Sequence, residues 1–450
     1  MNDHSVASQA QESRELLIRG GHVLPIDPAM PDMARGDVHV RDGVIVAVAE
    51  NIDAPGAEII DATNMVVMPG FVETHWHMWN GIWRGIVDDA AAYFRAHMLL
   101  HHYTADDHYA AVRFAALDAI NAGITTCNNW AHGVRHSEDA VAEMQALADS
   151  GIRAKFLYPC VVGGHATNVD DLKNARDWAE THGNGLLGVG VLLDETGAHI
   201  AEHVAMARDL GLRPITNHGG FLAAPDLIGP EFIFTHGPGI QPQAIELIKA
   251  KGVKVAFCPC TDPMIGNGLP PVYAMTCAEV PLDNLSFSVD VTGQTSADPF
   301  AALRMLVDSG RMQQVEAGNL TGSLLAIAQG GIEWKFGYKD ALRVGTLSGA
   351  NVLGLADQIG SLTPGKRADI ILVRTDEINM MPARNIDPTC LMLQNGKPNN
   401  VDTVIIDGHI RKRHGKLVGV DVDAVISSAA STLHEVRVRA AGEAAPNVSR

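Results

Sequence analysis

Eight short apolar runs, most of them followed by a helical stretch, constrain the fold of this 450-residue chain more than any other feature. Runs of this length that alternate with helices are typical of the strands of a parallel sheet. The predicted strands span residues 66–75, 124–130, 154–160, 187–193, 213–218, 232–237, 253–259 and 285–290. The predicted helices include residues 106–121, 138–150, 200–210 and 242–251. This α/β pattern predicts a TIM-like (β/α)8 barrel, a fold of about 250 residues. An open doubly wound sheet is the alternative.

The two ends of the chain differ in pattern from the barrel. Short alternating apolar segments broken by turns occupy residues 16–68, and similar segments return at 368–373 and 401–407. Such alternation predicts strands, arranged at the N-terminus as a small antiparallel unit. We therefore expect four segments. Residues 1–67 and 365–420 form a β-sandwich domain, residues 68–364 form a barrel, and residues 421–450 form a C-terminal helix with a mobile tail.

Composition argues against several classes of protein. With 34 basic and 52 acidic residues the formal charge is −18, which opposes binding to nucleic acid and to anionic membranes. No apolar run reaches the roughly 18 residues of a membrane span, and the polar start lacks the pattern of a signal peptide. Six cysteines in so long a chain form no disulfide framework. We expect a cytoplasmic protein with neither nucleic acid nor membrane as a partner.

Two histidines one residue apart end the first predicted strand. Residues 67–77 read VMPGFVETHWH, with His75 and His77 at the end. In an extended segment, residues i and i+2 point the same way, so both imidazoles can reach one cation. Chance is the alternative, because a chain with 20 histidines will contain some close pairs.

Further polar residues end other predicted strands. His218 ends the fifth, His236 the sixth and Asp290 the eighth. Each alone has the simpler explanation of a polar strand end. Catalytic groups of a (β/α)8 barrel lie at the carboxyl ends of the strands, so these side chains are expected to meet His75 and His77. Three neutral imidazoles and one carboxylate suit a cation such as Zn²⁺ or Fe²⁺, with water in an open position.

The chain resembles the amidohydrolase superfamily, most closely its branch of triazine hydrolases, chlorohydrolases and heterocycle aminohydrolases. The resemblance covers nearly the whole length. It rests on LLIRGG at residues 16–21, MPGFVETHWH at 68–77, CPC at 258–260 followed by GNG at 266–268, GSLTPGKRADIIL at 360–372 and VIIDG at 404–408. Together these motifs are specific for the family and not for a substrate.

The resemblance implies a role for each polar residue at the strand ends. His75, His77, His218 and Asp290 match the ligands of one divalent ion per subunit, Zn²⁺ or alternatively Fe²⁺, and His236 matches the histidine beside the metal-bound water. Asp290 would take a proton as the metal-bound hydroxide attacks a ring carbon. His236 would hydrogen-bond the nucleophile or the developing oxyanion.

One position departs from the family pattern. Deaminases of this branch carry a glutamate three residues after the fifth-strand histidine, where it transfers protons to the leaving group, and this chain has Phe221 there. Phe221, His132 and His165 are candidates for contact with the substrate. Either another group replaces the glutamate, or the leaving group needs less protonation, as chloride or sulfide does. The candidate replacements near strand ends are His132, His165, Asp194 and Glu195. Each has a simpler interpretation as a loop or helix cap.

Four of the six tryptophans lie at or just beyond the ends of the first two strands, namely Trp76, Trp79, Trp83 and Trp130. Three of them are spaced i, i+3 and i+7, which on a helix is one packing face. The alternative is a wall of the substrate site that stacks on a flat ring. Asn80 and Arg84 are further candidates for contacts with polar substituents of such a ligand, with exposed surface positions as the equal alternative for both.

These features predict a deaminase-like hydrolase that acts on carbon–nitrogen bonds other than peptide bonds. It would displace an amino or similar leaving group, chloride or sulfur included, from a small nitrogen heterocycle. Hydrolysis or desulfuration of a hydantoin-like cyclic amide or thioamide is the alternative. A non-catalytic barrel relative is the alternative from another class, and the retention of all four ligands argues against it. The resemblance also implies a homodimer or homotetramer, and the lack of a lysine in residues 187–193 favours a single metal ion.

Overall fold

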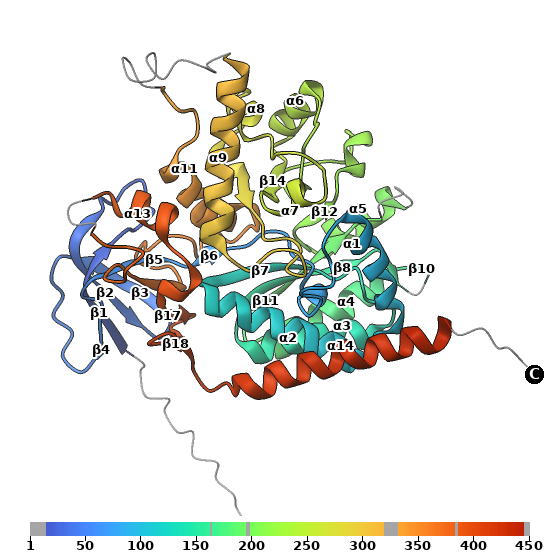
Figure 1. The fold of residues 1–450 in the computed structure, drawn as a ribbon, viewed down its shortest axis with the longest axis horizontal. Coiled ribbons are helices and arrows are strands. Elements are labelled where there is room, and N and C mark those ends of the chain that lie inside the picture. The colour runs from blue at the N-terminus through green and yellow to red at the C-terminus, as the bar shows by residue number, and fades with distance from the viewer. Residues whose placement is uncertain (1–14, 163, 195–198, 319–331, 383–385, 445–450) are drawn as a thin grey trace, which may run out of the picture.

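The computed structural model describes residues 15–162, 164–194, 199–318, 332–382 and 386–444. A parallel eight-stranded barrel lies beside a separate mixed sheet built from both ends of the chain (Figure 1). The predicted class of fold is therefore confirmed. Among the helices in the described ranges, none is long and apolar enough to cross a membrane.

The barrel strands follow one another in chain order, β6-β7-β8-β11-β12-β13-β14-β15. Their bounds are β6 Phe71–Val72, β7 Ile124–Trp130, β8 Arg153–Pro159, β11 Leu187–Leu192, β12 Ile215–Asn217, β13 Phe232–Thr235, β14 Lys254–Phe257 and β15 Leu285–Phe287. The segment after β6 closes the ring on the segment after β15. Thr74 N donates to Phe287 O at 3.3 Å, and His77 N donates to Asp290 O at 3.1 Å.

Helices follow most of the barrel strands. Their bounds are α1 Ala90–His97, α2 Ala105–Ala122, α3 Ser137–Ser150, α4 Val169–His182, α5 Ile200–Asp209, α6 Pro242–Lys251, α7 Thr261–Met264, α8 Val272–Cys277, α9 Pro299–Ala317, α11 Tyr338–Arg343, α12 Gly349–Val352, α13 Pro388–Asn395 and α14 Val422–Ala444. Local sequence sets the ends of α2. Thr104 and Asp107 form a capping box at its start, and Gly123 ends it with a left-handed φ of 90°.

The second sheet has the strand order β3-β2-β1-β5-β16-β17-β18-β19, with β4 beside β1. Its strands are β1 Glu15–Val23, β2 Met33–Arg41, β3 Val44–Ala49, β4 Glu58–Asp61, β5 Met65–Pro69, β16 Ile370–Arg374, β17 Val401–Ile406, β18 His409–Arg413 and β19 Lys416–Leu417. The N-terminal unit is mixed and not antiparallel as predicted, because β1 pairs in parallel with β4 and β5. Antiparallel pairing of β5 with β16 joins the two ends of the chain.

The chain passes from the mixed sheet to the barrel at Gly70. Its N–H donates to Asp369 O at 3.0 Å, and a Cβ at this position would lie 2.2 Å from the side chain of Thr125. The predicted first strand, residues 66–75, is therefore divided between two sheets, since β5 ends at Pro69 and β6 begins at Phe71. Both predictions of the part boundaries, at 67/68 and 364/365, stay predictions.

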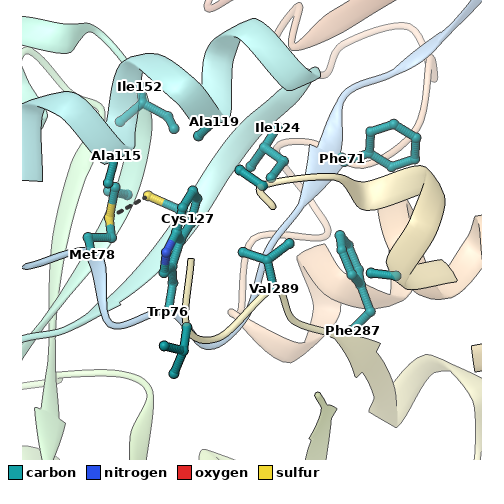
Figure 2. Packing of buried hydrophobic residues seen from close by; sticks show 14 of the residues in the cluster. Phe71, Trp76, Met78, Ala115, Ala119, Ile124, Cys127, Ile152, Phe287 and Val289 are labelled. Carbon is teal, nitrogen blue, oxygen red and sulfur yellow. Dashed lines mark hydrogen bonds between the residues drawn. The ribbon is translucent and has the colours of Figure 1, made fainter. Parts of the chain in front are cut away.

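The core lies directly beneath the carboxyl end of the first barrel strand. Trp76 packs near Met78 and Cys127, with Ala115 of α2 and Val289 nearby (Figure 2). Residues 75 and 77 point away from residue 76 in an extended segment, so burial of Trp76 directs both flanking histidines to the opposite side.

Polar contacts join the outer elements to the barrel. Arg153 at the start of β8 donates to Asp369 at 2.8 and 3.0 Å and to Asp407 at 3.1 Å. The C-terminal helix α14 lies along α2 (Figure 1), and Arg439 donates to His102 O at 3.0 Å and pairs with Asp107. The predicted tail lies in part outside the described residues.

Candidate functional site

The barrel brings together all five polar residues that the sequence places at strand ends. Candidate ligand atoms of His75, His77 and His218 lie within 4.8 Å of one another, as do those of His75, His236, Cys258 and Asp290. Asp290 Oδ1 lies 3.0 Å from His75 Nε2 and 3.4 Å from His77 Nε2. The rings of His218 and His236 stack at 5.3 Å.

The donor set fits a divalent cation. His75 Nδ1 is buried without a hydrogen-bond partner among the described residues, and its Nε2 shares one carboxylate oxygen with His77. Burial and the neighbouring imidazoles lower the pKa of His75 and of His77 well below the usual value. Neutral imidazoles beside an acidic side chain are the ligands that Zn²⁺ and Fe²⁺ prefer.

Buried groups fix the direction of His75. Glu73 Oε1 accepts its backbone N–H at 2.9 Å, and Ser288 Oγ donates to its carbonyl oxygen. The ring of Trp130 meets the imidazole edge-to-face at 4.0 Å. Burial raises the pKa of Glu73 to about 8.

Asp262 is hydrogen-bonded to His236, and the sequence did not predict it as a residue of the site. Its Oδ1 lies 2.9 Å from His236 Nδ1 and 3.1 Å from Asn267 Nδ2, and the residue is fully buried. Because an ionised carboxylate only accepts hydrogen bonds, it holds the proton of His236 on Nδ1 and leaves Nε2 free of that proton. A signal was present, since Asp262 follows the CPC motif at the end of β14.

Only one of the candidate replacements for the missing glutamate that the structure describes lies at the site. His132 lies at the site, with Nδ1 at 3.2 Å from His77 Nδ1 and its ring stacked on His218 at 5.7 Å. His165 is exposed in the short strand β10, His165–Ala166, and does not line the cavity described below. Asp194 follows β11 outside that lining, and Glu195 lies outside the described residues.

Phe221 does not face the site. It lies in the short helix η3, Gly220–Ala223, fully buried with its ring 5.1 Å from that of Phe232. Its neighbour Leu222 lines the cavity instead. The predicted contact of Phe221 with substrate is therefore wrong, because η3 turns this side chain into the core.

The four tryptophans are core residues and do not form a wall of the cavity. All four are fully buried, and none lines the cavity. Trp76 Nε1 donates to Thr292 Oγ1 at 3.2 Å, Trp79 Nε1 to Trp130 O at 2.9 Å, and Trp83 Nε1 to Tyr103 Oη at 2.9 Å. Burial gives these residues a structural role, but no helix carries the three of spacing i, i+3 and i+7, since only Trp79 lies in the short helix η1, Met78–Asn80.

Asn80 and Arg84 also lie outside the cavity lining. Asn80 is fully buried. Arg84 pairs with Asp118 at 2.5 Å and covers the ring of Phe114 at 4.9 Å. Their predicted contact with polar groups of a ligand is therefore wrong.

A cavity of about 880 Å³ opens above the polar cluster. His77, His218, His236 and Asp290 lie in its lining. Residues of α1 and of the following turn η2, Met98–His102, form one wall, and Arg135, Gln241, Asn267 and Gln294 add polar groups. This volume lies within the range of small-molecule sites.

Comparison with known proteins identifies the family. The sequence model of the amidohydrolase family matches residues 66–411, so the chain belongs to this family. It is a metal-dependent hydrolase acting on carbon–nitrogen bonds other than peptide bonds.

Curated relatives match over most of the chain. A 5'-deoxyadenosine deaminase of Methanobrevibacter smithii is 24% identical, covering 90% of this chain and 94% of its own. A 5-methylthioadenosine/S-adenosylhomocysteine deaminase of Desulforudis audaxviator is 28% identical, covering 93% and 98%.

Solved structures share the fold. A zinc-bound adenosine deaminase from Xanthomonas campestris has a TM-score of 0.77 at 20% identity, covering 94% of this chain and 99% of its own. A mutant atrazine chlorohydrolase from Arthrobacter aurescens, complexed with zinc and atraton, has a TM-score of 0.78 at 18% identity, covering 93% and 100%.

Proposed function

We propose that this hydrolase displaces an amino or similar leaving group from a nitrogen heterocycle. The observation that carries the proposal is the convergence of His75, His77, His218 and Asp290 beside His236 at the base of an 880 Å³ cavity. Full-length relatives named as deaminases of 5'-deoxyadenosine and 5-methylthioadenosine support this class of reaction.

The residues His75, His77, His218 and Asp290 would hold one Zn²⁺ per subunit, with Fe²⁺ as the alternative. When bound, such a cation activates water for attack at neutral pH. Asp290 Oδ1, already shared by two imidazoles, would accept the proton that the water loses.

His236 would stabilise the negative charge that develops on the attacked ring. Asp262 keeps the proton on Nδ1, so Nε2 hydrogen-bonds the nucleophile or takes up a proton to meet the developing charge. The Asp262 carboxylate would stabilise the charged imidazole in the second case. This arrangement gives His236 a defined orientation before the substrate arrives.

His132 is the proposed proton relay to the leaving group, because burial and His218 lower its pKa and keep the ring neutral, and it would pass on the proton that Asp290 takes from the water. Of the candidates on described residues, it alone both lines the cavity and contacts the cluster. His132→Gln should reduce turnover of amino substrates more than turnover of chloro substrates, because chloride needs no proton to leave. Equal losses for both would contradict this role.

Hydrolysis of a cyclic amide or thioamide is the second candidate function. The observation that favours it is that Asp290 is the only carboxylate among the described cavity-lining residues, with Phe221 at the position of the deaminase glutamate. In this reaction the carbonyl oxygen or thiocarbonyl sulfur takes up the developing charge, so no ring nitrogen has to be protonated before the attack.

Metal content and one conservative variant test the proposed site. Purified protein should contain about one Zn²⁺ or Fe²⁺ per chain, and Asp290→Asn should lose turnover by about 10³-fold or more while keeping its fold, since it lacks a proton acceptor. Less than one ion per two chains, with no rescue by added Zn²⁺ or Fe²⁺, would contradict the proposal. Retained activity in Asp290→Asn would do the same.

Product analysis separates the two candidate functions. Metal-loaded protein would be offered 5'-deoxyadenosine, 5-methylthioadenosine, amino- and chlorotriazines, cyclic amides and thiohydantoins. Ammonia or chloride released with an intact ring supports displacement on a heterocycle. A new carboxylate supports amide hydrolysis, and sulfide supports desulfuration.

A further inference from the structure

Arg135 introduces a positive charge into the cavity that the proposed chemistry does not use. The residue lies in the turn between β7 and α3, is half-buried and lines the cavity. Its backbone N–H donates to Asp139 Oδ2 at 3.0 Å. Among the described residues, its guanidinium group has no hydrogen bond, ion pair or aromatic ring as a partner.

The carboxylate nearest in sequence is already engaged. Asp139 is buried at the start of α3, and its Oδ2 accepts the backbone N–H groups of Arg135 and His136 at 3.0 and 2.9 Å. These contacts fix the backbone of the turn and leave the Arg135 side chain unneutralised.

The turn that carries Arg135 is tightly packed. His132 N donates to Trp130 O at 3.0 Å, and Val134 N donates to Ala131 O at 3.1 Å. A Cβ at Gly133 would lie 2.8 Å from His108 and 2.9 Å from Leu100. The base of the Arg135 side chain is therefore held by the same turn that carries His132 to the polar cluster.

The charge balance of the cavity differs from that of the whole chain. The chain carries a formal charge of −18, yet among the described lining residues Arg135 is the only arginine or lysine and Asp290 the only carboxylate. Asp290 lies with His75 and His77 at the base. A negatively charged ligand group would therefore meet a cation without a competing carboxylate beside it.

The wall formed by α1 and η2 carries exposed apolar side chains beside His97 and His101. Phe94 and Met98 line the cavity with 68% and 60% of their surface exposed. Side chains of this kind cover the faces of planar rings. The cavity thus combines an apolar wall with one arginine.

We propose that Arg135 binds a carboxylate or phosphate on the substrate, so that the preferred substrate is an anionic nitrogen heterocycle. The guanidinium fork matches either group with two parallel hydrogen bonds. This inference rests on the proposed function, because it assumes that the reacting ring occupies the cavity above the polar cluster.

Matched pairs of charged and neutral probes test the inference. Zinc-loaded full-length protein would be titrated with adenosine-5'-carboxylic acid and its carboxamide, and with N-(4,6-diamino-1,3,5-triazin-2-yl)glycine and its glycinamide. Adenosine 5'-monophosphate tests a phosphate group in place of the carboxylate. The variants are Arg135→Gln, Arg135→Lys and Arg95→Gln, the last being an exposed arginine of α1 outside the cavity lining.

We expect wild type to bind the charged member of at least one pair about 10- to 100-fold more tightly than the neutral member. Arg135→Gln should lose this preference, Arg135→Lys should keep part of it, and Arg95→Gln should match wild type. The probe whose binding falls most in Arg135→Gln identifies the group as carboxylate or phosphate.

Three binding results would overturn the inference. One is the absence of any preference for a charged probe in wild type. Another is a preference that persists in Arg135→Gln, which would place the anion on the metal ion. A loss of affinity for charged and neutral probes alike would show a structural role for Arg135 and would also overturn it.

The experiments distinguish failure of the proposed function from failure of the anion site at Arg135. Binding that depends on Arg135, without product from any heterocycle in the panel, would contradict the proposed function and leave the anion site in place. Product release from neutral and charged substrates with equal kcat/KM in wild type and Arg135→Gln would contradict the anion site alone.

Discussion

At the scale of single residues, a second carboxylate behind a histidine sets the chemistry of the site. Asp262 contacts His236 and Asn267 and reaches neither the cavity lining nor the candidate metal ligands. It acts by orienting the imidazole, and is thus a positioning residue. Its effect should appear in kcat with little change in metal content.

Asp262→Asn tests this positioning role. The asparagine amide allows His236 to carry its proton on the wrong nitrogen, so we expect kcat to fall by about 10²-fold or more. Metal analysis and the thermal unfolding midpoint should stay near the wild-type values. Asn267→Ala removes the amide donor to Asp262 together with one polar group of the cavity lining, and should lower kcat less than Asp262→Asn does. Unchanged kcat in Asp262→Asn would refute the role.

Residues at strand ends were predictable from the sequence because the barrel constrains them. The rule that strand ends meet at one edge is enough to bring His75, His218 and Asp290 together. Trp79 and Phe221 were harder, because they lie in short turns after a strand, where one residue of slippage reverses a side chain. Arg135 has no pattern around it that would distinguish it from a surface arginine.

At the scale of strands and helices, the candidate site residues His236 and Asp290 lie just beyond the ends of two barrel strands. β13 ends at Thr235, one residue before His236, and β15 ends at Phe287, three residues before Asp290. His236 and Asp290 have φ values of 70° and 56°. A left-handed φ cannot continue a strand, which explains why β13 stops before His236 although the predicted strand runs to residue 237.

Gly70→Ala tests the junction between the two sheets. The added methyl group would lie 2.2 Å from the Thr125 side chain, so β5 or β7 must shift, and we expect destabilisation of about 1–3 kcal/mol or more. Gly442→Ala in α14 is the matched control, because a Cβ there meets nothing within 4 Å and alanine favours a helix. Urea unfolding of both variants measures the difference; equal stability would contradict the steric argument.

At the scale of the whole molecule, buried charges hold the mixed sheet against the barrel. Burial opposes the charge of Arg153, but Asp369 and Asp407 together hold its pKa above the usual value. Lys412 of β18 donates to Asn121 O at 2.6 Å at the end of α2. Neither contact could be inferred from sequence, because each pairs residues from distant parts of the chain.

Lys412 should make stability depend on pH. Burial lowers its pKa to about 8, although Asp402 and Asp118 favour the charged form. The unfolded chain has a lysine pKa of about 10.4, so between these values the unfolded state binds more protons and the free energy of unfolding rises with pH. From about pH 7.5 to 9.5, wild type should gain about 2 kcal/mol relative to Lys412→Met. Urea unfolding at both pH values checks this, and identical changes in the two proteins would refute it.

The position of β5 in the mixed sheet has a consequence for synthesis of the chain. This buried strand pairs with β1 on one side and with β16 on the other, and β16 leaves the ribosome only after the entire barrel. Until then the growing polypeptide presents an open apolar strand edge, the feature that most readily recruits other chains. A strand that is translated after the barrel is therefore the one that covers a strand translated before it.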